Sequence, residues 1–254
     1  RWTSMSRGLG DVYKRQASGR LAALIGLRGG VQPVPTRGGF ADLAHLKSQT
    51  PLPETADELC AVARGLGADV RDLRLGANAT EAEVKRLNVS GDLARYRIIH
   101  FATHGTLAGQ ISGATEPGLI LTPPETATER DDGYLSGSEI ASLKLDAEWV
   151  ILSACNTAGG SDETNAEALS GLARVFFYAG ARALLVSHWE VYSEPTVKLI
   201  TSAVRALSDG SVGRAEALRR AMLNLIDNGA PNEAHPSYWA PFVVVGEGAV
   251  VVRR

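Results

Sequence analysis

The sequence predicts an α/β fold with a mostly parallel central sheet. Four short, near-continuous apolar runs bounded by turn residues have the composition of strands that are covered on both faces. Helical patterns alternate with these runs along the chain, an order typical of layered α/β sandwiches. The 254 residues suffice for a sizeable core in one or two domains, and 44% hydrophobic and 21% charged residues are ordinary values for a globular protein.

The composition argues against several classes of protein. Lys and Arg number 26 against 28 Asp and Glu, so the net charge is −2, and no basic block marks a nucleic-acid binder. No run approaches the roughly 20 apolar residues of a membrane span. Two cysteines exclude a disulfide scaffold and fit a reducing, cytoplasmic compartment. The sequence has neither a phosphate-binding loop nor a Gly-x-Ser-x-Gly elbow, so no cofactor is predicted.

The N-terminal residues are expected to lie outside the fold. Residues 1–16 begin with Arg instead of Met, show neither helical nor strand periodicity, and lack the apolar stretch of a signal peptide. We interpret them as a translated cloning junction or a disordered leader. Residues 17–50 are predicted to be loop-rich and residues 51–254 to form one domain. The chain is therefore interpreted as a fragment whose true N-terminus is missing.

The first half of the predicted domain alternates helices and strands. Apolar residues at three-to-four spacing predict a helix from about residue 54 that Gly67 ends. A strand is expected over 69–75. A second helix opens at Thr80, because a threonine followed three residues later by glutamate is a capping-box pattern. Residues 97–102 then form an apolar, β-rich run.

The second half continues the alternation. Further apolar runs predict strands at 148–154, 183–187 and 241–246. Helical periodicity predicts helices at 166–179, 196–207 and 212–226. Residues 106–134 form a long Gly- and Pro-containing excursion with one apolar patch, and such long loops are usually functional or disordered.

Two residues suited to catalysis stand at the ends of predicted strands. In open α/β sheets, ligands bind beyond the carboxyl ends of the strands, where His104 and Cys155 lie in this sequence. They are 51 residues apart, close to the about 50 residues between the catalytic histidine and cysteine of caspases. An imidazole can take the thiol proton and later protonate a leaving amine. Gly105 lets a substrate carbonyl approach the backbone, so its amide can supply half of an oxyanion hole.

Four ordered motifs resemble a known family. Residues 100–105 (HFATHG), 152–158 (LSACNTA), 187–191 (SHWEV) and 235–242 (HPSYWAPF) are similar to the CHAT domain, a bacterial relative of caspases and separases. The resemblance covers roughly residues 51–248. It implies a caspase-like αβα sandwich and a hydrolase, a cysteine endopeptidase that acts on a protein or peptide substrate. It also implies that tetratricopeptide-type repeats precede this domain in the full-length chain.

The resemblance assigns catalytic roles to individual residues. It implies that Cys155 is the nucleophile, that His104 is the catalytic histidine, and that the backbone amides of Gly105 and Cys155 are the oxyanion donors. We predict no third, acidic catalytic residue beside Cys155 and His104. Because an unrestrained endopeptidase harms its own cell, we expect control by the missing repeats and by the 106–134 excursion.

The residues that contact the substrate are less well specified. In separase-like relatives an acidic residue near the motif tryptophan recognises a basic side chain at the cleavage site, a role open here to Glu190 or Glu194. A solvated surface glutamate is the other interpretation. His188 either lines the cleft or serves a structural role. Many relatives carry aspartates where this chain has Tyr192 and Ser193, which leaves the substrate preference open.

The same sequence features allow other interpretations. His100 and His104 are four residues apart, but their segment is β-rich and lacks the glutamate of the helical zinc motif, so no metal site is predicted. His100 is expected to pack or hydrogen-bond within the fold, and Cys60 to be inert core. The alternatives to a peptidase are a latent or pseudo-protease module that serves as an interaction platform, and an amidase or transpeptidase with the same dyad.

Overall fold

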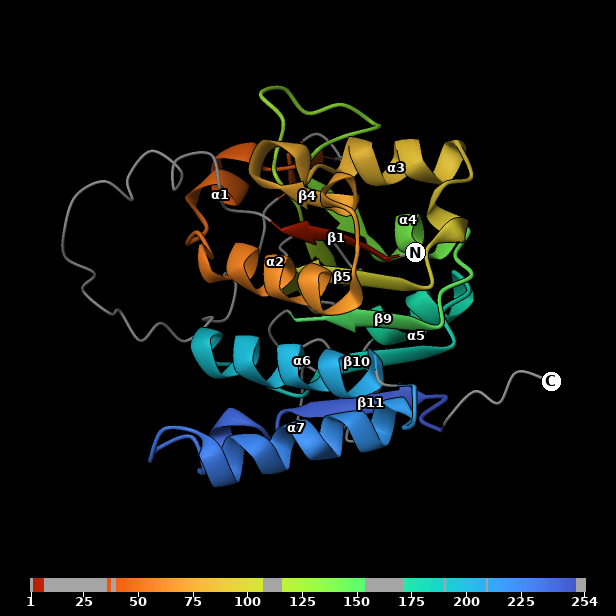
Figure 1. The fold of residues 1–254 in the computed structure, drawn as a ribbon. Helices are drawn as coiled ribbons and strands as arrows, with labels where there is room; N and C mark the ends of the chain where they lie inside the picture. The colour runs from red at the N-terminus through yellow and green to blue at the C-terminus, as the bar shows by residue number, and fades with distance from the viewer. Residues whose placement is uncertain are drawn as a thin grey trace.

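A six-stranded sheet forms the centre of the molecule. The structure, a computed structural model, describes residues 2–6, 36–37, 40–106, 116–153, 171–189, 191–208 and 210–249. The strand order is β4 (Leu73–Leu75), β1 (Trp2–Ser6), β5 (Ile98–Ala102), β9 (Trp149–Leu152), β10 (Ala183–Ser187) and β11 (Phe242–Gly246), from top to bottom in Figure 1. All neighbours pair in parallel except β10 and β11, which are antiparallel. The predicted α/β fold with a mostly parallel sheet is confirmed.

Helices cover both faces of this sheet. The face toward the viewer in Figure 1 carries α2 (Glu54–Leu66), α6 (Ser193–Ser208) and α7 (Arg214–Asn228). The opposite face packs against α3 (Glu81–Val89), α4 (Gly137–Ser142) and α5 (Gly171–Tyr178). The result is a three-layered αβα sandwich. None of the helices in the described ranges is both long and apolar enough to cross a membrane.

The side chains of β9 show why the strands are apolar throughout. Val150 and Leu152 belong to the hydrophobic core on one face, and Trp149 and Ile151 belong to the core on the other. All four are 0% exposed. Successive side chains of a strand point to opposite faces, so a strand between two helical layers has no polar side. Burial of each such side chain contributes about 1.5–3 kcal/mol, and the sandwich rests on these two cores.

The predicted end of α2 and start of α3 agree with the structure, whereas α6 begins three residues before the predicted position, because Pro195 is tolerated in its first turn, and α7 lies two residues later than predicted. α2 ends at Gly67, whose backbone has a φ of 61° in the left-handed region that glycine favours. The Thr80 side chain accepts a hydrogen bond from the Glu83 backbone N–H and caps α3. The expected strand over 69–75 is shorter, because 3₁₀ helix takes up Val70–Asp72 before β4 begins.

A second, smaller sheet lies where the sequence predicted a long excursion. It consists of the antiparallel strands β6 (His104–Thr106), β7 (Gly118–Ile120) and β8 (Tyr134–Ser136). The apolar patch of the excursion is therefore a strand. Ahead of α2 lie a two-stranded ribbon and a short helix, which are β2 (Thr36–Arg37), β3 (Phe40–Ala41) and α1 (Leu43–Ser48).

The structure differs from the sequence-based expectation at the N-terminal residues. Residues 1–16 were expected to contribute nothing to the fold, whereas Trp2–Ser6 form β1, which pairs with β4 on one side and β5 on the other. Five residues are too few to show a clear period-two pattern. Their place is set by backbone pairing with strands distant in sequence, which local periodicity does not report.

Candidate active site

The chain passes from the central sheet to the small sheet just before His104. β5 ends at Ala102, and the hydroxyl of Thr103 then donates a hydrogen bond to the backbone carbonyl of Ile120 in β7. His104 begins β6 directly opposite Ile120 and is 4% exposed. The predicted catalytic histidine therefore has a fixed place at the carboxyl end of a central strand, where ligands bind in open α/β sheets.

A backbone carbonyl orients the His104 ring. The Nε2 atom of His104 lies 2.8 Å from the carbonyl oxygen of Thr50, in the turn that precedes α2. A carbonyl oxygen only accepts hydrogen bonds, so Nε2 carries a proton. In the neutral imidazole, Nδ1 is then the nitrogen that takes up a proton. The sequence could not point to Thr50, because a backbone carbonyl has no signature in residue type.

The strand that leads to Cys155 lies beside β5. Phe101 of β5 is the register partner of Leu152 in β9, and the Ser153 backbone N–H donates to the Phe101 carbonyl at 3.0 Å. The pairing thus continues to the last described residue before the predicted nucleophile. Cys155 itself lies outside the described residues, and so does its backbone amide, one of the two predicted oxyanion donors.

A fully buried polar cluster spans three elements next to this edge. Nε2 of His100, on β5, lies 2.9 Å from Ser153 Oγ and 2.8 Å from Oε1 of Glu58, on α2. All three side chains are 0% exposed. The expectation that His100 hydrogen-bonds within the fold is confirmed. Glu58 and Ser153 were not singled out from the sequence, since one lies in an ordinary amphipathic helix and the other at the end of an apolar strand.

The remaining predicted site residues are spread over several elements. Gly105 lies in β6 opposite Leu119. His188 follows β10 with an exposed side chain, and its backbone N–H donates to the Pro241 carbonyl at 2.9 Å. The side chain of Glu194, in the first turn of α6, is 79% exposed and lies 3.5 Å from Lys198 Nζ. Glu190 falls outside the described part of the chain.

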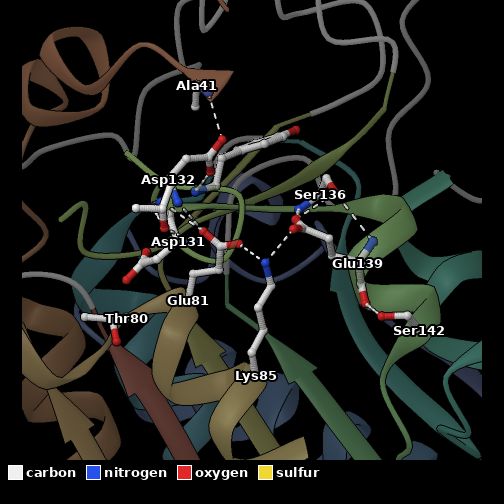
Figure 2. A network of polar contacts seen from close by, with 12 residues as sticks. Ala41, Thr80, Glu81, Lys85, Asp131, Asp132, Ser136, Glu139 and Ser142 are labelled. Carbon is white, nitrogen blue, oxygen red and sulfur yellow. Dashed lines mark hydrogen bonds and ion pairs between the residues drawn. The ribbon is translucent and has the colours of Figure 1, made fainter. Parts of the chain in front are cut away.

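Ion pairs and backbone contacts fasten the small sheet to α3 and α4 (Figure 2). Lys85 Nζ bridges Glu81 Oε1 at 2.5 Å and Glu139 Oε1 at 2.6 Å. The other Glu81 oxygen accepts from the backbone N–H groups of Asp132 and Gly133, at 2.8 and 2.9 Å. Glu81 is 1% exposed, so these contacts are well shielded from water. They hold the turn that leads into β8.

Asp132 and Glu139 extend this support on either side. The carboxylate of Asp132 accepts from the backbone N–H of Ala41 at 2.8 Å and from that of Tyr134 at 2.9 Å. Glu139 and Ser136 form a capping box at the start of α4. The network thereby joins α3, β3, β8 and α4 around the small sheet that carries His104.

A cavity of about 600 Å³ lies away from these residues. Its lining includes Ile98 and Trp149, the first residues of β5 and β9, together with Arg97 and Glu148. It therefore opens at the amino ends of the strands, opposite the edge that carries His104. Among the residues that the structure describes, no three His, Cys, Asp or Glu side chains gather in a group that could hold a metal ion.

Comparisons with known proteins identify relatives of the whole domain. A family model described as the CHAT domain matches residues 14–247. Tetratricopeptide repeat protein 28 of Homo sapiens is 26% identical over 234 residues, which cover 77% of this chain and 8% of that protein. The present chain thus spans only a small part of this curated relative.

Two solved structures are also similar to this chain. The crystal structure of the Arg-specific cysteine proteinase gingipain R matches with a TM-score of 0.46 and 12% identity, over 89% of this chain and 48% of that one. The complex of Porphyromonas gingivalis RgpB pro- and mature domains matches with a TM-score of 0.48 and 11% identity, over 89% and 49%. This chain therefore spans about half the length of either structure.

Proposed function

Because the chain belongs to the CHAT domain family, we propose that it is a cysteine endopeptidase in which Cys155 is the nucleophile and His104 the base. The observation that carries the proposal is the orientation of His104. Its Nε2 donates to the Thr50 carbonyl, so the proton-accepting nitrogen is Nδ1, as a general base requires. The carbonyl takes the place of a third, acidic residue and does not itself titrate.

Chain continuity supports the proposed pairing of the two residues. Cys155 follows Ser153 by two residues, and two residues of extended chain span at most about 7 Å. Ser153 is bonded through its backbone to Phe101, three residues before His104. His104 therefore follows the carboxyl end of β5 by a few residues, and Cys155 follows the carboxyl end of the adjacent parallel strand β9 by a few residues.

In the proposed reaction, Nδ1 of His104 takes the proton of the Cys155 thiol, and the sulfur attacks the scissile carbonyl carbon. The carbonyl oxygen becomes an oxyanion, which the backbone N–H groups of Gly105 and Cys155 stabilise. His104 then gives its proton to the leaving amine as the C–N bond breaks. Water, activated by the same imidazole, hydrolyses the thioester and restores the free thiol.

Substrate preference and regulation are part of the same proposal. We assign Glu190, Glu194 and His188 to the substrate-binding surface, where a carboxylate would favour a basic side chain at the cleavage site. The exposure of Glu194 leaves its carboxylate accessible to such a side chain. The two cysteines of the chain fit a reducing cytoplasm.

We further propose that tetratricopeptide-type repeats precede the domain in the full-length chain. The name of the human relative, Tetratricopeptide repeat protein 28, supports this architecture. Together with the 106–134 segment, the repeats would restrain the peptidase until a signal releases it. If limited proteolysis shows no change in residues 106–134 on activation, this segment is not the control element.

The activity is tested with a peptide library, with Cys155→Ala as the blank and an added amine as a competing acceptor. Cleavage by the wild-type chain that the Cys155→Ala variant lacks supports the peptidase. Transfer of the acyl group to the amine in place of hydrolysis would identify a transpeptidase. Intact peptides in every reaction, including those with the full-length chain, would identify a pseudo-protease module.

A further inference from the structure

We infer that Ser153, His100 and Glu58 form a buried tether that positions the segment carrying Cys155. The inference rests on the proposed function and concerns residues that do not touch the substrate. Ser153 is the last described residue before Cys155 and directly follows the end of β9 at Leu152. Whatever fixes Ser153 limits where the nucleophile can lie.

The tether holds Ser153 through both its backbone and its side chain. The backbone N–H donates to the Phe101 carbonyl at 3.0 Å, as in a continued parallel ladder. The hydroxyl oxygen lies 2.9 Å from His100 Nε2, on the neighbouring strand. A backbone bond alone leaves the chain free to rotate about it, whereas two contacts from one residue fix its direction as well.

The imidazole of His100 depends in turn on Glu58. Its Nδ1 has no hydrogen-bond partner among the described residues, so the ring is oriented through Nε2, which hydrogen-bonds Ser153 Oγ and lies 2.8 Å from Glu58 Oε1, an ion pair when His100 is protonated. Polar groups buried in this way lose their contacts with water and are held by their protein partners. The three side chains come from α2, β5 and the end of β9, so the cluster locks a helix onto two strands.

The same helix also reaches the candidate base. Glu58 lies in α2, and the turn that leads into α2 supplies the Thr50 carbonyl to His104. α2 and its preceding turn therefore reach both arms of the candidate site, at His104 directly and at Ser153 through His100. This double contact gives the tether a function beyond packing, because it sets the two arms relative to each other.

His100 is a positioning residue and not a second base. Its ring is 0% exposed and its Nε2 is occupied by Glu58 and Ser153, so a substrate cannot reach it. Its effect on the reaction passes through the backbone near Cys155. A displacement of about 1 Å at a reacting group can lower a rate by about 100-fold, which is ample leverage for such a residue.

The experiment follows the rate of Cys155 alkylation by iodoacetamide against pH, read by mass spectrometry, together with the melting temperature. Ser153→Ala removes only the hydroxyl. His100→Leu removes the polar link, and His100→Gln keeps an N–H donor near the position of Nε2. Tyr96→Phe is the matched control, since it removes one hydroxyl bond, to Asp72 at 3.1 Å, at the opposite end of β5.

We expect Ser153→Ala and Tyr96→Phe to lower the melting temperature alike, by about 2–4 °C. Of these two variants, only Ser153→Ala should slow Cys155 alkylation at pH 7, by about tenfold or more. It should also shift the pH profile of Cys155 alkylation toward that of an ordinary thiol with a pKa of about 8.5. His100→Leu should do the same, and His100→Gln should restore most of the reactivity.

The outcomes separate the tether from the dyad. If Cys155 of the wild-type protein alkylates below the pH of an ordinary thiol and the folded Ser153→Ala variant has the same pH profile, the tether is overturned and the proposed function stands. A wild-type profile like that of an ordinary thiol overturns both. If His100→Leu does not fold, the Ser153→Ala result still decides, because that variant leaves the contact between His100 and Glu58 in place.

Discussion

The central sheet carries the arm that leads to Cys155, and the small sheet carries the arm with His104. The two sheets are stabilised in different ways. The central sheet is packed between two hydrophobic cores, and its polar cluster at Glu58, His100 and Ser153 is fully buried. The small sheet has three short strands, of which Leu119 and Leu135 join one of these hydrophobic cores, and Figure 2 shows the turn before β8 held in addition by charged side chains and backbone N–H groups.

The difference indicates which arm can move. Apolar burial on two faces gives the central strands a stability close to that of the whole fold, whereas the small sheet has strands of only three residues and depends in part on polar contacts, so it can open locally at lower cost. We therefore predict that the arm with His104 opens more readily than the arm that leads to Cys155. Each prediction below alters one arm and leaves the other intact.

Removal of the base is expected to have the largest effect. His104→Ala should lower the peptidase rate by about 10²–10⁴-fold, the usual contribution of general acid–base catalysis, while the cooperative unfolding transition persists. The measurement is peptide cleavage by single-turnover kinetics, with His235→Ala as the control because the His235 ring bonds within its own 3₁₀ turn, to Ser237. Equal losses in the two variants would contradict a specific role for His104.

Loss of the Glu81 carboxylate should loosen the small sheet. In Glu81→Ala, Lys85 loses one of its two carboxylate partners, and the backbone N–H groups of Asp132 and Gly133 lose their acceptor. The free energy of unfolding should therefore fall by about 3 kcal/mol. Hydrogen exchange should speed up at 118–136 and not at 149–152.

Glu83→Ala, on the same helix, is the matched control for Glu81→Ala. It removes carboxylate bonds to Arg86, whose side chain is 57% exposed, and to Arg74, which is 12% exposed and keeps its bond to the Arg71 carbonyl, so it should cost about 1–2 kcal/mol. Uniform loss of protection in both sheets of the Glu81→Ala variant would show that the sheets do not differ in local stability.

A smaller change within the same sheet tests the hydroxyl contact between its strands. The Tyr134 hydroxyl lies 2.7 Å from Thr106 Oγ1 and donates to the Glu116 carbonyl at 3.0 Å. Tyr134→Phe keeps the ring and should reduce the free energy of unfolding by about 1 kcal/mol, measured by urea denaturation. Because burial raises the pKa of Tyr134, the phenol is neutral at pH 7 and no charge is lost. An unchanged free energy would mean that this hydroxyl contact does not contribute to the stability of the small sheet.

The smallest effect concerns the second cysteine, which lies in α2. Burial raises the pKa of the Cys60 thiol above its ordinary value. A raised pKa leaves less thiolate at neutral pH, so Cys60 should alkylate more slowly at pH 7 than a free thiol and speed up only above about pH 8.5. Mass spectrometry of the same alkylation reaction reports both cysteines, and a Cys60 rate at pH 7 that equals or exceeds that of a free thiol would contradict the raised pKa.

The parts of the fold that depend on local pattern were predictable from sequence. Strands β5, β9 and β10 were recognisable because both of their faces are buried, and Gly67 and Thr80 mark helix ends through backbone and capping chemistry. What the sequence could not provide is pairing between distant segments. β1 is set by its neighbours, and the small sheet pairs residues separated by an excursion that local pattern did not resolve.

The candidate site shows the same division. His104 stood out because its residue type, spacing and strand end agree with one chemistry. Thr50 acts through a carbonyl that every residue has, and Glu58 lies on a helix with many charged residues. Their importance comes from burial and contact with a histidine, and neither is visible without coordinates.

The central claim is that His104 activates Cys155, and the pH dependence of Cys155 alkylation tests it most directly. The account predicts that Cys155 reacts well below pH 8.5, that His104→Ala removes this advantage, and that Cys60 reacts alike in both proteins. A Cys155 profile that matches an ordinary thiol and is unchanged by His104→Ala would contradict the account.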